Sequence, residues 1–130
     1  MKFIIPEKPQ GKARPRLSRY GTYTPQKTKD YEQLVKYSYL QVSNKMWTSA
    51  LKIKIYAYFR PPKSLSKKKQ NELIGTPYIH KPDSDNIAKI ILDGLNGIAY
   101  TDDNQVTTLE VHKIYSKEEY TEVEILEESN

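Results

Sequence analysis

The sequence predicts a mixed α/β (α+β) domain, in which a small sheet of about four strands packs with two main helices. Hydrophobic residues recur at helical spacing in two long segments and alternate with polar residues in three others. No linker or repeat divides the 130 residues. We therefore expect a single domain spanning residues 1–130, long enough to bury a hydrophobic core without disulfides.

The expected helices show apolar residues on one face. In the clearest helix, Ile87, Ile91 and Leu95 share one face, and Gly97 follows at the expected C-cap. The predicted helices cover Thr24 or Pro25 to about Ser43, Ser66–Ile74 and Asn86–Leu95.

The expected strands are short, apolar or alternating segments that end at turn-forming residues. They cover Phe3–Ile5, Thr22–Thr24, Ala50–Phe59, Val106–Ser116 and Tyr120–Leu126. The segment Lys8–Gly21 is rich in Pro, Gly and Arg and is predicted to be a loop. Lys117–Glu119 is predicted to form a hairpin turn between the last two strands. Trp47 is expected in the core.

Composition excludes several classes of protein. The chain has no cysteine, which excludes a disulfide scaffold, a zinc–thiolate site and a cysteine nucleophile. No apolar run approaches the roughly 18 residues of a membrane span, and the N-terminus lacks a signal peptide. We therefore expect a soluble, cytoplasmic protein with no membrane partner.

Positive charge is concentrated in the first 116 residues, which carry 20 basic and 10 acidic residues. Phosphate binding requires such a charge distribution, because each neutralised phosphate releases a counterion. Solvated surface loops would also account for it. The predicted DNA-binding residues are Lys12, Arg14, Arg16, Arg19, Lys63, Lys67, Lys68 and Lys69. Tyr20 and Tyr23, beside the first basic cluster, are candidates for stacking on bases.

Acidic residues gather within residues 80–106 of this basic region. Asp83 and Asp85 precede the clearest helix, and a short return after it is expected to bring Asp102 and Asp103 back toward them. Converging carboxylates repel one another unless a cation neutralises them. Hard oxygen ligands of this kind suit Mg²⁺ or Mn²⁺.

Each acidic feature also has a purely structural explanation. Asp83 or Asp85 could cap the helix, and residues 102–104 have the composition of an ordinary turn. Lys89 and Asp93 could form a surface ion pair. An EF-hand does not fit, because Gly is missing at its sixth position and Glu at its twelfth.

The reaction that fits both charge clusters is phosphodiester hydrolysis. Divalent cations would activate water and stabilise the leaving oxygen, while basic residues hold the polyanion. Lys89 lies one helical turn after Asp85 and could stabilise charge on the scissile phosphate. No Gly-rich phosphate loop is present, so no nucleotide cofactor is expected.

The central motifs resemble the signature of the RusA family of Holliday junction resolvases. They read Lys81-Pro82-Asp83-x-Asp85-Asn86-x-x-Lys89, Asp93-Gly94-Leu95-Asn96-Gly97 and Asp102-Asp103-x-Gln105-Val106. Two further segments resemble the phage-associated branch of that family. They are Pro9-x-Gly11-Lys12-x-Arg14-Pro15-Arg16 and Arg60-Pro61-Pro62-Lys63-Ser64.

The resemblance implies a bacterial or phage-encoded homodimer that nicks four-way DNA junctions symmetrically with Mg²⁺, or Mn²⁺ in its place. It places the catalytic, metal-binding aspartates at Asp83, Asp85 and Asp103, and the functional lysine at Lys89. Asp102 is an additional candidate ligand. A two-fold dimer suits two paired cuts, because a four-way junction has approximate two-fold symmetry.

Other functions remain open at this point. One is a less selective Mg²⁺ nuclease that acts on flaps, forks or RNA. Another is a non-catalytic module that binds branched DNA, in which the acidic residues would only cap helices and turns. A transcriptional regulator fits least, since no helix-turn-helix spacing is present.

Overall fold

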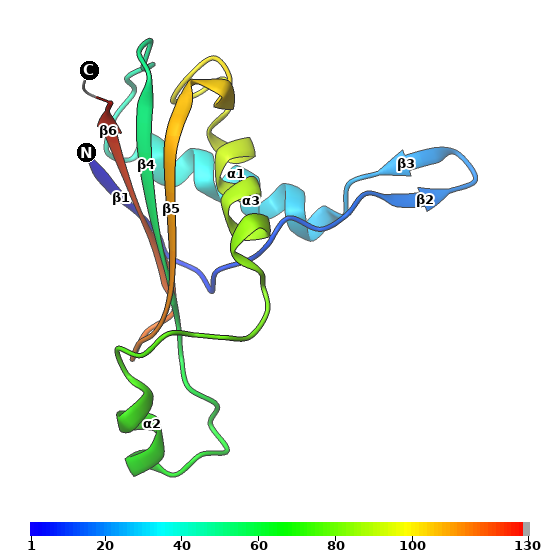
Figure 1. Cartoon of the computed structure of the whole chain (residues 1–130). Helices are drawn as coiled ribbons and strands as arrows, with labels where there is room; N and C mark the ends of the chain where they lie inside the picture. Colours follow the sequence, from blue (N-terminus) through cyan, green and yellow to red (C-terminus); the bar gives the residue numbers. More distant parts are fainter. Residues whose placement is uncertain (129–130) are drawn as a thin grey trace.

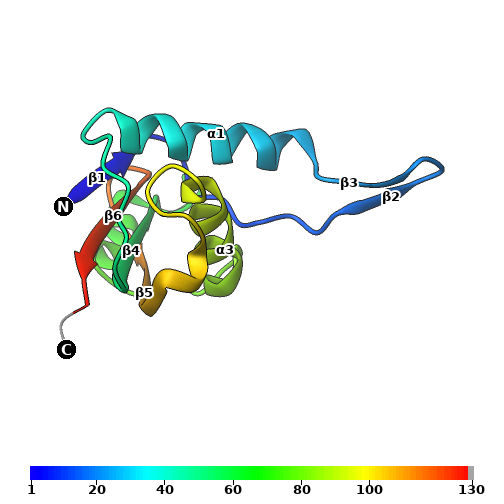
Figure 2. The same cartoon turned by 90° about the horizontal axis from the view of Figure 1, so that it is seen from above.

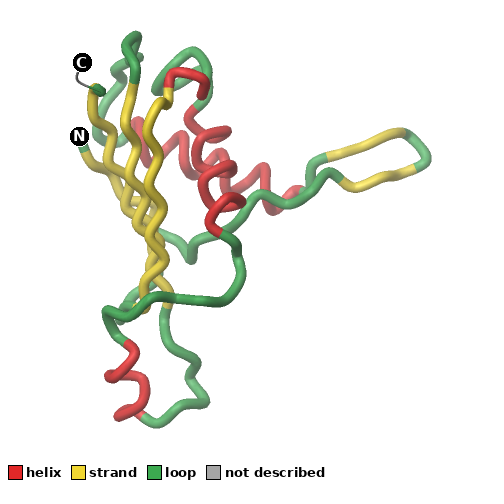
Figure 3. Tube along the Cα trace, viewed as in Figure 1, coloured by secondary structure: helices red, strands yellow, loops and turns green. Residues whose placement is uncertain are grey.

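The computed structural model describes residues 1–128 and contains one mixed four-stranded sheet (Figures 1 and 3). The strand order is β1 (Lys2–Ile5), β6 (Tyr120–Glu127), β4 (Leu51–Phe59) and β5 (Val106–Tyr115). β4 and β5 are parallel, and the other neighbours are antiparallel. Two helices, α1 (Gln26–Leu40) and α3 (Ser84–Leu95), cover one face of the sheet (Figure 2). The predicted α+β class is confirmed.

The remaining elements lie outside this two-layer body. β2 (Arg16–Ser18) and β3 (Gly21–Tyr23) form a separate hairpin, so the prediction of a loop over Lys8–Gly21 missed one strand. The short helix α2 (Lys67–Leu73) begins after Ser66, whose hydroxyl accepts a hydrogen bond from the Lys69 amide. The 3₁₀-helix η1 (Asp103–Gln105) leads directly into β5.

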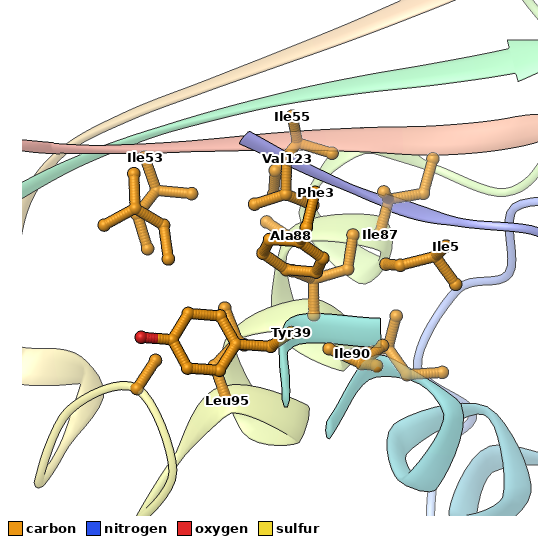
Figure 4. Packing of buried hydrophobic residues seen from close by; sticks show 14 of the residues in the cluster. Phe3, Ile5, Tyr39, Ile53, Ile55, Ile87, Ala88, Ile90, Leu95 and Val123 are labelled. Carbon is orange, nitrogen blue, oxygen red and sulfur yellow. The ribbon is translucent and has the colours of Figure 1, made fainter. Parts of the chain in front are cut away.

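The hydrophobic core lies between the sheet and the two helices (Figure 4). Every second residue of β4, from Leu51 to Phe59, is fully buried, as expected for a strand with one face on the core. On α3, Ile87, Ile91 and Leu95 are buried. Trp47, which was expected in the core, is only partly buried and packs against this cluster. No helix within residues 1–128 is long and apolar enough to cross a membrane.

α1 and α3 approach each other closely at Gly94. A Cβ atom placed on Gly94 would lie 2.8 Å from Val35 Cβ and 3.1 Å from the Glu32 carbonyl oxygen. Because Gly94 has no side chain, α3 can lie this close to α1. This approach fixes the position of α3 and of the acidic residues on it.

The predicted hairpin between the last two strands is wrong. β5 and β6 are not neighbours, because β4 lies between them and pairs with both. The chain leaves β5 across the end of β4, where the Ser116 amide donates to the Phe59 carbonyl at 2.8 Å. The alternating pattern identifies the buried face of each strand but carries no information on the order of strands in the sheet.

Candidate active site

Asp83 occupies the N-cap position of α3 with extended backbone angles, yet its side chain makes no capping hydrogen bond. Within residues 1–128, its carboxylate has no side-chain hydrogen bond or ion pair. Capping therefore does not explain this carboxylate, which remains free to accept an external ligand.

The N-terminal segment packs directly on the start of α3. The Lys12 amide donates to the Asn86 carbonyl oxygen at 2.8 Å. A Cβ atom on Gly11 would lie 2.8 Å from Pro82 Cβ and 3.0 Å from Asn86 Cβ. Residue 11 must be small for this approach, which holds the segment beside Asp83.

The Lys12 side chain points into the protein. Its ammonium donates to Glu32 Oε2 at 2.7 Å and lies 3.1 Å from Asp93 Oδ2. Burial alone would lower the pKa of Lys12, but hydrogen bonds and charge from Glu32 and Asp93 raise it above its ordinary value. Asp93 thus pairs with Lys12 and not with Lys89, the partner that the helical spacing suggested.

A cleft of about 890 Å³ opens between this segment, the start of α1 and the residues before α3. Asp83 lies in its wall, and most of the charged residues around it are basic. These basic residues are Lys8, Lys12, Arg14, Arg16, Lys27 and Lys81. A cleft of this charge suits a polyanionic backbone, and it brings that backbone to a free carboxylate.

The segment before α3, which carries Asp83, is held by contacts with the ends of β4 and β5. Tyr78 stacks on Phe59 with ring centroids 3.9 Å apart and meets the Tyr115 ring edge-on. The Tyr78 amide also donates to the Lys113 carbonyl at 2.9 Å. These contacts hold the chain that leads from α2 to Asp83.

Asp85 and Lys89 lie on α3 after Asp83, and both are exposed. Asp85 is in the first turn, where a negative charge favours the helix dipole. Neither side chain forms an ion pair in the part of the chain that the structure describes. Both are therefore available to a ligand from solvent.

Asp102 and Asp103 differ in their environments. The Asp102 carboxylate accepts a hydrogen bond from the Asp103 amide at 2.9 Å and forms a capping box with Gln105. Asp102 thus has the structural role that the turn composition of residues 102–104 suggested, because its carboxylate caps η1. Burial raises the pKa of Asp103, as do the neighbouring carboxylates of Asp102 and Asp93, whereas Lys89 lowers it.

The carboxylates expected to converge do not form a three-ligand group within residues 1–128 of one chain, and their metal-binding roles stay a prediction. The return after α3 leads into η1, where the charges of Asp93 and Lys89 act on Asp103, whereas Asp83 stands at the N-cap of α3. Asp83 and Asp93 are ten residues apart along the helix, about 15 Å on its axis, so one ion cannot bridge those two carboxylates. Accordingly, no three His, Cys, Asp or Glu side chains within residues 1–128 gather to hold a metal. The carboxylates suit Mg²⁺ chemically, but the described residues of one chain do not gather the set.

The sequence matches the family described as Endodeoxyribonuclease RusA over residues 6–126, which includes the cleft, α3 and η1. This chain belongs to the RusA family. It is also similar to the uncharacterized protein YqaN of Bacillus subtilis (strain 168), with 36% identity over 138 aligned positions. That alignment covers 99% of this chain and 97% of YqaN.

The predicted DNA-binding residues of this RusA-family chain are divided between the cleft, the β2–β3 hairpin and the region of α2. Arg14 and Arg16 line the cleft, and Arg19 lies at the tip of the β2–β3 hairpin. Lys12 is engaged within the protein. The second basic cluster lies on and before α2, at the far end of the sheet from η1 (Figure 1). It comprises Lys63, Lys67, Lys68 and Lys69, all of them exposed.

Three basic residues of the RusA-family cleft are absent from the predicted DNA-binding set, namely Lys8, Lys27 and Lys81. Lys81 lies two positions before Asp83, inside the family motif, and that position could have indicated it. Lys27 lies in the first turn of α1 and reaches the cleft through the fold, with no local signal in the sequence. The structural roles of Glu32 and Asp93 were also missed, because they depend on the packing of α1 against α3.

Proposed function

We propose that this protein is a divalent-metal-dependent endonuclease that resolves four-way DNA junctions by paired symmetric nicks during recombination and repair. The observation that carries the proposal is the uncapped Asp83 carboxylate in the wall of a basic cleft, in a member of the RusA family. Such an enzyme would act in the cytoplasm of a bacterium, on cellular or phage DNA.

The cleft supports binding of the sugar-phosphate backbone. Arg14 and Arg16 come from the N-terminal segment, Lys27 from α1, and Lys81 from the segment before α3. Because these residues come from different elements, a bound strand is held along several phosphates and not at one point. The strand is thereby kept in register with Asp83.

Asp83, Asp85 and Asp103 would hold Mg²⁺, or Mn²⁺ in its place. When bound, the ion supplies an activated water and charge stabilisation at the scissile phosphate. Lys89 lies on α3 between these aspartates and contributes positive charge that offsets negative charge developing on the phosphate. Asp102 caps η1 and so positions its neighbour Asp103.

The lack of a three-ligand group within residues 1–128 supports a site shared between subunits. If one ion uses Asp83, Asp85 and Asp103 together, these carboxylates must come from two different chains. An isologous homodimer creates two such sites related by a two-fold axis, which matches the two strands cut in a junction.

The decisive experiment is cleavage of a synthetic four-way junction by the full chain with Mg²⁺. We expect paired nicks from the wild-type protein, no nicks from Asp83→Asn, and unchanged junction binding by that variant. Asp30→Asn is the matched control, because Asp30 is an exposed acid on α1 outside the cleft. A linear duplex cut as fast as the junction would contradict the junction selectivity.

A substrate panel separates the remaining nuclease activities. Flaps, replication forks and an RNA hairpin are compared with the four-way junction at equal concentration. Faster cleavage of any of these would assign the protein to that substrate. Junction binding without cleavage of any substrate, with no Mg²⁺ binding by calorimetry, would identify a binding module.

A further inference from the structure

The β2–β3 hairpin projects from the body of the protein (Figures 1 and 2). All six residues of its two strands are exposed, and they pair only with each other. An isolated two-stranded hairpin is marginally stable in water, since it has no hydrophobic layer to pack on. We therefore expect that a binding partner covers and stabilises this projecting hairpin.

The hairpin carries large apolar side chains that the protein itself does not cover. Leu17 is 83% exposed, Tyr20 is 89% exposed and Tyr23 is 49% exposed. Leu17 lies on one face of the hairpin, Tyr23 on the other, and Tyr20 at the turn. Tyr20, at the tip, thus has the largest exposed fraction of the three side chains.

Positive charge accompanies these side chains. From Lys8 to Lys29 the sequence has seven basic residues and no acidic one. Arg16 is the cross-strand partner of Tyr23, and the Arg19 guanidinium lies 5.5 Å from the centre of the Tyr20 ring. Alternating arginine and aromatic residues are typical of surfaces that bind phosphates and stack on bases.

The turn has a defined shape despite its exposure. The Ser18 hydroxyl accepts a hydrogen bond from the Tyr20 amide at 3.2 Å and donates to the Gly21 carbonyl at 3.1 Å. Gly21 adopts φ +114°, which a residue with a side chain rarely adopts. The backbone that carries Tyr20 is therefore held in a defined turn.

We propose that the arm Arg14–Tyr23 inserts into the branch point of junction DNA and that Tyr20 stacks there on an exposed base. This inference rests on the proposed function and names the part of the protein that recognises the branch. The base of the arm lies at the cleft, since Arg14 and Arg16 line it with Asp83. A strand held in the cleft thus leads directly to the arm.

A second copy of the chain is the less favourable occupant of the same surface. Two copies that met arm to arm across a two-fold axis would bring like charges together. DNA instead supplies phosphates for the arginines and flat bases for the tyrosines, which become accessible where four helices meet.

The test uses the full chain, EDTA to prevent cleavage, and a four-way junction with 5-iodouracil at the branch point. We expect irradiation to crosslink the probe to Tyr20, as identified by peptide mass spectrometry. Tyr20→Ala should weaken junction binding by about tenfold, the loss expected for one stacked base, without weakening binding to linear duplex. Tyr20→Phe should bind as the wild type does.

Tyr37→Ala is the matched control, because Tyr37 is 57% exposed on α1 outside the arm. This variant should bind both the junction and the linear duplex as tightly as the wild type does. Equal junction binding by Tyr20→Ala and wild type, or an equal loss on junction and duplex, would overturn the proposal. Conversion of a wild-type dimer to monomers by Tyr20→Ala, measured by sedimentation, would also overturn it in favour of a second copy.

The proposed function is judged separately, by nicking with Mg²⁺. If the wild-type protein nicks junctions while Tyr20→Ala binds them normally, the arm proposal fails and the nuclease proposal stands. If crosslinking to Tyr20 occurs but no substrate is cut, the arm binds branched DNA and the nuclease proposal fails.

Discussion

Lys12 and Asp93 form an ion pair in which Lys12 Nζ lies 3.1 Å from Asp93 Oδ2. The same ammonium donates to Glu32 Oε2 at 2.7 Å, so one side chain connects the N-terminal segment with both α1 and α3. Without it, the carboxylates of Glu32 and Asp93 would face each other at a half-buried position. Lys12 thus positions the cleft wall next to Asp83.

Replacing Lys12 by Met removes this connection while keeping most of the side-chain volume. We expect Lys12→Met to lower the free energy of unfolding by about 1–3 kcal/mol, because it leaves two partly buried carboxylates without a partner. Urea denaturation measures the change. Lys8→Met is the control, since Lys8 is exposed in the same segment and its loss should cost little. Equal stability of the two variants would contradict this role.

The pH dependence of stability gives an independent check. The pKa of Lys12 in the folded protein is raised above its ordinary value of 10.5. A raised lysine pKa stabilises the fold fully at pH values below the unfolded pKa, and this contribution is lost as pH rises through the folded pKa. The stability difference between wild type and Lys12→Met should therefore be constant at neutral pH and shrink above about pH 10.5. A stability difference between wild type and Lys12→Met that grows above pH 10.5 would contradict a raised pKa of Lys12 in the folded protein.

Gly11 is predicted to control the position of Asp83 more than the stability of the fold. In Gly11→Ala, the new Cβ would lie 2.8 Å from Pro82 Cβ, so the N-terminal segment or the start of α3 must shift. We expect reduced nicking with a loss of stability of about 1–2 kcal/mol. Gln10→Ala, one position earlier, should nick normally. Full activity of Gly11→Ala would show that the close approach is not required.

The local parts of the fold could be predicted from sequence, and the long-range parts could not. The period of Ile87, Ile91 and Leu95 identified α3 because a helix with one buried face imposes that spacing. The parallel pairing of β4 with β5 had no local signal, because strand order depends on the path of the connection. The predicted hairpin failed for the same reason.

The same distinction applies to the candidate site. Asp83 and Asp85 precede the helix predicted over Asn86–Leu95, and the structure places Asp83 at the N-cap and Asp85 in the first turn of α3. Sequence could not give the partner of Lys12, since α1 and α3 must pack before Glu32 and Asp93 meet it. Sequence reasoning also expected the return after α3 to gather Asp83, Asp85 and Asp103, whereas no three such side chains gather within residues 1–128.

Gln105 is predicted to position Asp103. Its amide oxygen accepts a hydrogen bond from the Thr101 amide at 2.9 Å, and its amide nitrogen donates to the Trp47 carbonyl at 3.0 Å. Gln105→Ala leaves these groups unpaired, and we expect a loss of about 1–2 kcal/mol in unfolding free energy together with weaker nicking. Gln105→Glu keeps the acceptor but loses the donor, so it should fall between Ala and wild type. Asn104→Ala, an exposed neighbour, should match the wild type in both measurements.

The proposed sharing of a site between subunits predicts complementation between two inactive proteins. Asp83→Asn and Asp103→Asn homodimers should each fail to nick. In a mixed dimer, one shared site combines both substitutions, while the other combines the intact Asp103 of one chain with the intact Asp83 of its partner. Mixing equal amounts of the two variants under conditions of subunit exchange should therefore restore single nicks at about a quarter of all sites, without paired cuts, because half of the dimers are mixed and each has one intact site. Asp83→Asn mixed with Asp85→Asn is the control, because both substitutions fall at the start of the same helix and every shared site then lacks one of these aspartates. No recovery in the first mixture, despite confirmed exchange of subunits, would show that each active site is built from one chain.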